Sequence, residues 1–181
     1  MKYDYFFIQN LYTDEECQEL RQHIESLTDY GVPDSPAEGV VKTANVKCFI
    51  YGDVGNRLKK MRHRVLDINK HCFGLDLFET SDYEVLHYNS YNPESNGEYG
   101  WHKDGCKNES HDVKLTALIN LSEDYQGGKF ELFLNGPLEI SEFQKTGSFL
   151  LFPSWITHRV TPVTAGKRIT LSQFYTGPNF K

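Results

Sequence analysis

The spacing of apolar residues in the first part of the chain predicts helices. After an aromatic-rich strand expected over 3–8, Thr13-Asp14-Glu15-Glu16 fits a capping box, with Thr13 as N-cap and Glu16 reaching back. The helix that follows is expected to end near Thr28, and its apolar residues recur at helical spacing. A second helix is predicted over 54–72 by the same periodicity. The apolar stripes of the two helices are Cys17, Leu20, Ile24 and Leu27, and Leu58, Met61, Val65, Ile68 and Cys72.

From residue 75 onward the pattern changes to short strands separated by turn residues. Asn-Pro, Gly-Gly, Asn-Gly and Ala-Gly pairs stand between apolar segments, as turn chemistry requires. Eight strands are predicted, over 83–89, 98–103, 115–121, 129–134, 138–140, 147–152, 157–161 and 168–175. Strands after helices predict a mainly β protein of the α+β class, with the helices packed on one side. Eight strands suit a double-sheet jelly roll.

Length and composition favour one ordinary globular domain. A chain of 181 residues can bury a sizeable core, and 39% hydrophobic with 24% charged residues is typical of that class. We saw no linker, repeat or low-complexity segment, so a single domain over 1–181 is expected, with helical support in 1–74 and a β core in 75–178. The net charge of -6 argues against a nucleic-acid partner, although the basic run 57–64 is present on the second helix.

Cysteine usage and hydropathy bear on location. The cysteines are scattered without a C-x-x-C pair, which predicts reduced thiols and a reducing compartment such as the cytoplasm. No apolar run approaches ~18 residues, and no charged start leads into an apolar stretch, so neither a membrane span nor a signal peptide is expected. The four cysteines are Cys17, Cys48, Cys72 and Cys106.

The segment Trp101-His102-Lys103-Asp104-Gly105 carries the strongest chemical signal. Side chains two apart on an extended segment point the same way, so His102 and Asp104 present an imidazole and a carboxylate to one spot. His158, 54 residues after Asp104, offers a third ligand. Two histidines and one carboxylate form a facial triad that holds Fe(II) and leaves the opposite side open. The spacing therefore predicts an iron site.

Arg168, ten residues after His158, adds a second chemical element. On a strand it shares a face with Thr170, while Ile169 takes the other face. A buried arginine requires an anion, and its planar fork suits a carboxylate held by two parallel hydrogen bonds. With the hydroxyl of Thr170 nearby, this pattern is typical of a site for the far end of a dicarboxylate cosubstrate.

Four segments carry a resemblance to a known family: 99–104 with the H-x-D pattern, 127–132 with Gly-Gly-Lys-Phe-Glu-Leu, 147–168, and the tail Phe174-Tyr175-Thr176-Gly177-Pro178. They are similar to the 2-oxoglutarate and Fe(II)-dependent dioxygenases, in the prolyl 4-hydroxylase-like branch with small bacterial and viral forms. The resemblance covers residues 83–178 and implies a double-stranded β-helix, a cupin-like jelly roll.

The resemblance also implies roles for individual residues. His102, Asp104 and His158 match the iron ligands, and Arg168 matches the partner of the distal carboxylate of 2-oxoglutarate. A tyrosine before the H-x-D pattern contacts the cosubstrate in the family, for which Tyr91 is the first choice and Tyr88 the second. The family converts 2-oxoglutarate and O2 to succinate and CO2 as a C–H bond is hydroxylated, with ascorbate as an accessory reductant. The implied partner is a peptide or protein substrate, with a prolyl residue expected.

Alternative functions stay open at this point. The same oxygenase chemistry could act on a small molecule or a nucleic acid. A non-catalytic cupin-like module would hold a metal without turnover, but such a module has no need for a buried arginine at position 168. The sequence does not define the oligomeric state.

Overall fold

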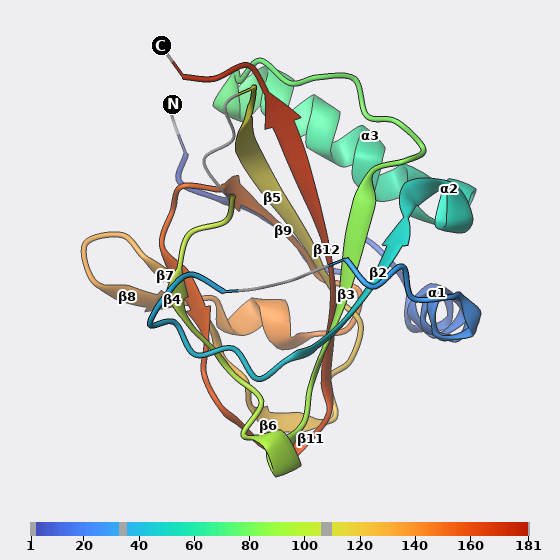
Figure 1. Ribbon diagram of the computed structural model, residues 1–181, viewed down its shortest axis with the longest axis vertical. Coiled ribbons are helices and arrows are strands. Elements are labelled where there is room, and N and C mark those ends of the chain that lie inside the picture. The colour runs from blue at the N-terminus through green and yellow to red at the C-terminus, as the bar shows by residue number, and fades with distance from the viewer. Residues whose placement is uncertain (1–2, 33–35, 106–109, 181) are drawn as a thin grey trace.

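Two antiparallel sheets face each other in the computed structural model, which describes residues 3–32, 36–105 and 110–180 (Figure 1). The larger sheet consists, in order, of β1 (Phe6–Ile8), β9 (Phe149–Pro153), β5 (Asp112–Asn120), β12 (Arg168–Gly177), β3 (Val85–Tyr91) and β2 (Asn45–Ile50). The smaller sheet consists of β4 (Tyr99–His102), β10 (His158–Val160), β7 (Phe130–Phe133) and β8 (Pro137–Glu139). A short pair, β6 (Tyr125–Gly127) with β11 (Val163–Gly166), closes one end. The predicted double-stranded β-helix is confirmed.

The first helix begins where the sequence predicts it. In α1 (Asp14–Ser26) the Glu16 amide donates to Thr13 Oγ1 at 3.2 Å, and the Thr13 amide donates to Glu16 Oε2 at 3.0 Å. The segment predicted as one helix over 54–72 is instead divided into short pieces. Gly55 has φ 45°, a left-handed value that a continuous helix does not allow. The pieces are α2 (Tyr51–Val54), a 3-10 turn (Gly55–Leu58), α3 (Lys59–Ile68) and a π turn (Asn69–Phe73).

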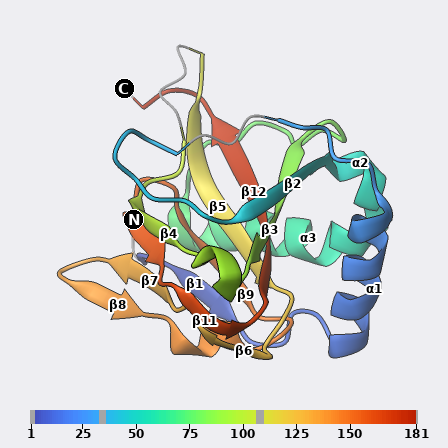
Figure 2. The ribbon, with the colours of Figure 1, turned by 60° about the horizontal axis from the view of Figure 1, so that its bottom comes forward.

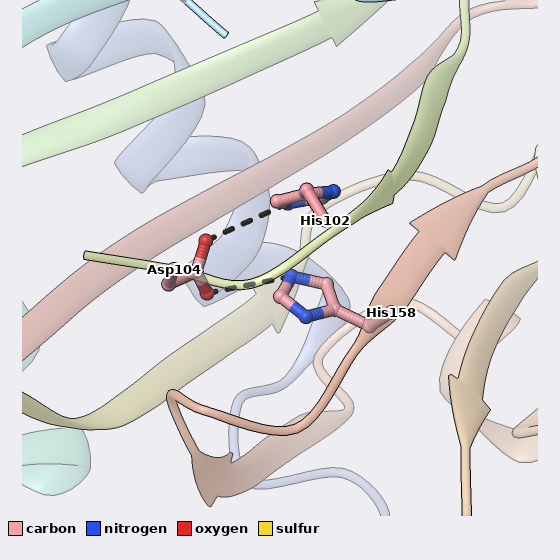
Figure 3. Close-up of side chains that lie close together, drawn as sticks. All are labelled: His102, Asp104 and His158. Carbon is pink, nitrogen blue, oxygen red and sulfur yellow. Dashed lines mark ion pairs between the residues drawn. The ribbon is translucent and has the colours of Figure 1, made fainter. Parts of the chain in front are cut away.

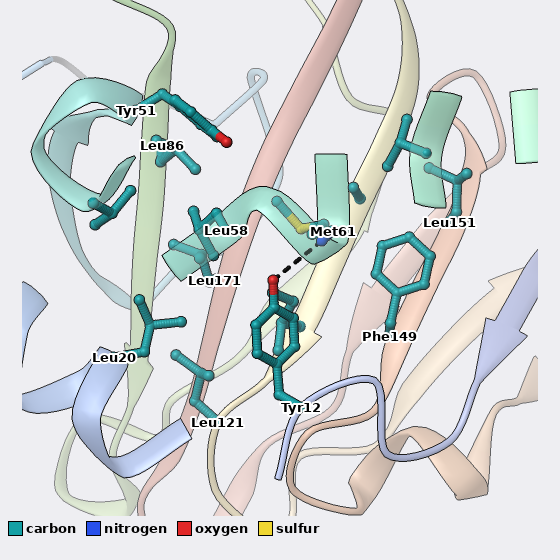
Figure 4. Close-up of a cluster of buried hydrophobic side chains, with 14 of the residues drawn as sticks. Tyr12, Leu20, Tyr51, Leu58, Met61, Leu86, Leu121, Phe149, Leu151 and Leu171 are labelled. Carbon is teal, nitrogen blue, oxygen red and sulfur yellow. Dashed lines mark hydrogen bonds between the residues drawn. The ribbon is translucent and has the colours of Figure 1, made fainter. Parts of the chain in front are cut away.

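The helices cover the outer face of the larger sheet. Figure 2 shows α1 and α3 on one side of this sheet, with β7 and β8 on the other side. The apolar faces of the helices and the sheet form the larger core, in which the Met61 amide donates to the Tyr12 hydroxyl at 3.1 Å (Figure 4). A second core fills the space between the two sheets and includes Leu118, Phe130 and Phe152.

The N-terminal segment contributes strands as well as helices. β1 pairs with β9 and β2 pairs with β3, so both edges of the larger sheet come from the first 50 residues. The sequence pattern missed β2, β6 and β11. β2 reads Asn-Val-Lys-Cys-Phe-Ile; polar and apolar residues alternate only as far as Cys48, and its two buried residues, Cys48 and Phe49, are neighbours in sequence. Its place is set by pairing with β3.

Successive side chains of β12 point to opposite faces of the larger sheet. Ile169 and Leu171 enter the helix-side core, whereas Arg168, Thr170 and Ser172 line a cavity between the sheets. The predicted two faces of this strand are confirmed.

Two further sequence predictions concern location. None of the helices in the described part of the chain is both long and apolar enough to cross a membrane. Among the described cysteines, Cys17, Cys48 and Cys72, there is no disulfide bond. Cys106 lies outside the described residues.

Candidate metal centre

His102, Asp104 and His158 meet at the open end of the space between the sheets (Figure 3). His102 ends β4 and is the cross-strand neighbour of His158, the first residue of β10. The Nε2 atoms of His102 and His158 lie 3.5 Å and 3.4 Å from Asp104 Oδ1 and Oδ2. One ligand atom from each residue lies within 4.8 Å of the others. The structure thus brings together the three residues of the predicted triad.

Both imidazoles are held in the tautomer that a metal requires. Nδ1 of His102 lies 2.8 Å from the Gly100 carbonyl oxygen, and Nδ1 of His158 lies 2.9 Å from the Ile156 carbonyl oxygen. A carbonyl oxygen can only accept, so each Nδ1 carries the hydrogen and donates. Each Nε2 then keeps its lone pair and faces Asp104, the arrangement in which a backbone carbonyl orients a metal-binding histidine.

Burial and mutual attraction set the ionisation of the cluster. Burial lowers the pKa of His158, which keeps its ring neutral at physiological pH. Burial alone would raise the pKa of Asp104, but its position beside the imidazoles of His158 and His102 and the hydrogen bond from Thr116 hold it below its usual range. A neutral imidazole and an ionised carboxylate are the forms that ligate a divalent metal. With no thiolate among the three ligands, the set fits Fe(II) of the facial-triad type.

Arg168 lies at the other side of the same cavity, which has a volume of about 570 Å³. Its side chain is 1% exposed, and its guanidinium lies 5.1 Å from the centre of the Tyr91 ring. Its Nε and Nη1 atoms are buried, and neither has a hydrogen-bond partner among the described residues. Two unpaired donors on a buried cation are costly unless an anion binds them.

Gly128 makes room for this arginine. A Cβ atom at Gly128 would lie 2.9 Å from Arg168 Cδ, and the residue has φ +58°. Glycine is the residue that meets both requirements, since it has no Cβ and adopts positive φ at little cost. The Gly-Gly pair singled out in the sequence therefore supports the cavity as well as a turn.

The other predicted site residues divide between two places. Thr170 and Tyr91 line the cavity, and Tyr91 is the cross-strand neighbour of Arg168. Tyr88 points to the opposite face of β3, into the helix-side core, where its hydroxyl donates to Glu25 Oε1 at 2.7 Å. The assignment of Tyr88 as second choice for the cosubstrate contact is therefore not supported by its position.

Several residues of the cavity wall were not among the predicted site residues. Pro36, Ala37 and Lys42 come from the segment before β2, which is tied to the edge of β4 because the Gly100 amide donates to the Val41 carbonyl at 2.8 Å. His87, Asn89, Ser172 and Phe174 line the cavity on β3 and β12. The alternation that predicts Ser172 on the face of Arg168 could have predicted the other three as well, because all four occupy alternate positions of the strands that carry Tyr91 and Arg168.

The fold and the cluster together define a class of protein, the double-stranded β-helix with a two-histidine, one-carboxylate metal centre. Comparison with known families agrees with this class. Residues 86–176, half of the chain, match the model of the 2OG-Fe(II) oxygenase superfamily. The chain belongs to this superfamily.

Solved structures and curated relatives show the same likeness. The fold matches a Pseudomonas putida prolyl-4-hydroxylase with a TM-score of 0.73 at 19% identity, covering 98% of this chain and 94% of that one. It matches the viral collagen prolyl hydroxylase vCPH of Paramecium Bursaria Chlorella virus-1 with a TM-score of 0.69 at 18% identity and 97% coverage of both. A PKHD-type hydroxylase of Colwellia psychrerythraea is 35% identical over 57 residues, which is 32% of this chain and 25% of the relative. The chain thus spans only a fraction of the length of the curated relatives it matches.

Proposed function

We propose that the chain is an Fe(II)- and 2-oxoglutarate-dependent dioxygenase that hydroxylates a C–H bond, with a prolyl residue of a peptide or protein as its substrate. The observation that carries the proposal is the buried guanidinium of Arg168, in which two donors have no partner within the described part of the chain and which shares a cavity with the His102–Asp104–His158 cluster. A module that only held a metal would not require this second, anion-binding feature.

The residues present fit both groups. The Nε2 atoms of the two histidines and one oxygen of Asp104 would hold Fe(II), and Arg168 with Thr170 would hold the distal carboxylate of 2-oxoglutarate. When bound, these groups supply the oxidising chemistry in which O2 and 2-oxoglutarate give succinate, CO2 and a hydroxylated product. Ascorbate as an accessory reductant belongs to the same proposal.

The protein's own contribution is to hold the charged groups in place and to limit water. Leu118, Phe130 and Val160 form apolar walls of the cavity, and they belong to the core between the sheets. Inside such walls the attraction between a guanidinium and a carboxylate is stronger than in bulk water. The rigid sheets on either side keep the donors oriented before a ligand arrives, which avoids the cost of ordering them.

Two features support a peptidyl substrate. The similar solved structures are named as prolyl hydroxylases, which is an argument by analogy. Apolar residues of the cavity lining include Pro36, Ala37 and Phe174, and the lining also includes the amide side chain of Asn89. Such surfaces suit a ring and a peptide backbone better than a row of phosphates, which would call for clustered Lys and Arg.

The test is an anaerobic titration with Fe(II) and 2-oxoglutarate, followed by exposure to O2 with a library of proline-containing peptides. We expect succinate formation above the uncoupled background and a mass gain of one oxygen atom in a subset of the peptides. Oligonucleotides serve as the contrasting substrates. Stimulation by oligonucleotides alone would refute the peptidyl substrate, and tight metal binding without any binding of 2-oxoglutarate would refute the oxygenase.

A further inference from the structure

We propose that Thr116 and Ser154 position the carboxylate of Asp104, so that one chosen oxygen faces the metal. The inference rests on the metal site of the proposed function and adds two residues that contact neither metal nor cosubstrate in that proposal.

The two hydroxyls form a chain that ends on Asp104. Thr116 Oγ1 lies 2.7 Å from Asp104 Oδ2 and 2.9 Å from Ser154 Oγ. Thr116, on β5, is 1% exposed, and Ser154 is 0% exposed. At such burial, these contacts are the means by which both hydroxyls satisfy their hydrogen-bonding capacity.

The chain can run in only one direction. An ionised carboxylate is an acceptor only, so the single hydroxyl hydrogen of Thr116 must go to Asp104 Oδ2. Thr116 then has no hydrogen left for Ser154, and Ser154 must donate to Thr116. Hydrogen bonds that act in series polarise one another, which strengthens the last bond onto the carboxylate.

Ser154 also holds Asp104 through the backbone. The Asp104 amide donates to the Ser154 carbonyl oxygen at 3.0 Å, and the Ser154 amide donates to the Lys114 carbonyl at 3.1 Å. Ser154 lies in the turn between β9 and β10, four residues before His158. This turn therefore fixes Asp104 at its main chain and at its side chain, and links it to the segment of the third ligand.

The consequence is a choice between the two carboxylate oxygens. Oδ2 is engaged by Thr116, which leaves Oδ1 as the oxygen with its lone pairs free of a hydroxyl donor. A carboxylate that ligates through one oxygen occupies one coordination position. Binding through both oxygens would occupy a further position and would leave less room at the metal for the proposed cosubstrate.

The experiment compares Thr116→Val, which removes the hydroxyl at nearly constant volume, with Thr116→Ser, which keeps it. Binding of Co(II) to the full chain is measured by calorimetry, and the Co(II) absorption spectrum reports the ligand field. We expect Thr116→Val to weaken Co(II) binding roughly 10- to 100-fold, the usual effect of removing a partner of a metal ligand. Thr116→Ser should restore the wild-type affinity and spectrum, which a merely structural effect on the apo fold would not do.

Ser154→Ala supplies the matched second variant. Because Ser154 acts through Thr116, we expect a smaller loss than in Thr116→Val, and the double variant should bind Co(II) no more weakly than Thr116→Val alone. Wild-type affinity and spectrum in Thr116→Val would overturn the inference while leaving the metal site intact. If the wild-type chain instead binds Co(II) no more tightly than His158→Ala does, the metal site is overturned, and the inference with it.

Discussion

Replacing Arg168 with Met should change two properties of the protein in opposite directions. The guanidinium is buried, and two of its donors have no hydrogen-bond partner among the described residues, so it carries a desolvation cost that is not recovered without a ligand. A flexible thioether side chain fills apolar space without that cost. We therefore expect Arg168→Met to lose 2-oxoglutarate binding while the metal-free, ligand-free protein becomes more stable.

The magnitudes follow from the contacts of the side chain. A buried unsatisfied donor costs about 1–3 kcal/mol, so the two donors together cost about 2–6 kcal/mol, and the Tyr91 ring beside the guanidinium returns roughly 0.5–2 kcal/mol. The net gain from Arg168→Met is on the order of 1–3 kcal/mol, and each kcal/mol raises Tm by about 2–4 °C for a chain of this size. On the ligand side, removing one partner of a buried charge pair costs roughly 2–5 kcal/mol. That loss corresponds to a Kd for 2-oxoglutarate about 30- to 4,000-fold higher.

The assay measures both quantities on the same variants. Thermal unfolding is followed for the ligand-free protein, and 2-oxoglutarate is titrated anaerobically in the presence of saturating Fe(II). Arg159→Met is the matched control, because Arg159 Nε donates to Glu131 Oε2 at 2.7 Å and its guanidinium lies over Trp101, away from the cavity. The control should leave 2-oxoglutarate affinity unchanged. Equal 2-oxoglutarate affinity in Arg168→Met and wild type would refute the anion-binding role, and a Tm several degrees lower would refute the desolvation argument.

Three further predictions concern the same site. His158→Ala should abolish most Fe(II) binding in anaerobic calorimetry, whereas the control His63→Ala on α3 should bind normally; full affinity in His158→Ala would remove it from the ligand set. Fe(II) affinity should fall as pH drops below about 6.5, where an ordinary histidine gains a proton that competes with the metal. Because burial lowers the pKa of His158, protonation of this residue should weaken Fe(II) binding only at lower pH. Undiminished Fe(II) affinity at pH 5 would count against two histidine ligands. Gly128→Ala should destabilise the fold by roughly 1–3 kcal/mol and weaken 2-oxoglutarate binding in the titration above, because the new Cβ would lie 2.9 Å from Arg168 Cδ. Unchanged stability and unchanged 2-oxoglutarate affinity would show that Arg168 shifts to accommodate the methyl group without loss.

Local rules were sufficient for the elements that carry the chemistry. The alternation of a strand places Arg168 and Thr170 on one face whatever sheet the strand joins, and the capping box at Thr13 acts within four residues. His102 and Asp104 are two apart in sequence, so the last residue of β4 and the bend that follows it bring them together. Each of these statements depends on neighbours in sequence, which is why the sequence alone could predict them.

Features that depend on pairing between strands distant in sequence could not be predicted from the sequence. Tyr88 and Tyr91 must face opposite sides of β3 because they are three apart, but only the register with β12 decides which one enters the cavity. The alternation in β2 ends at Cys48, and the segment becomes a strand through its pairing with β3. Thr116 stands 12 residues after Asp104 and 38 before Ser154, so no local pattern connects them.

The site is divided between the two sheets, and this division explains how a few motifs become one centre. His102 and His158 belong to the smaller sheet, whereas Arg168 and Thr116 belong to the larger one. Their separation is set by the apolar core between the sheets, to which Leu118 and its neighbours contribute. A dicarboxylate bound to the metal at one end and to Arg168 at the other would therefore span both sheets. Its fit would depend on this core as well as on the groups that bind it, because the core between the sheets determines the length of the span.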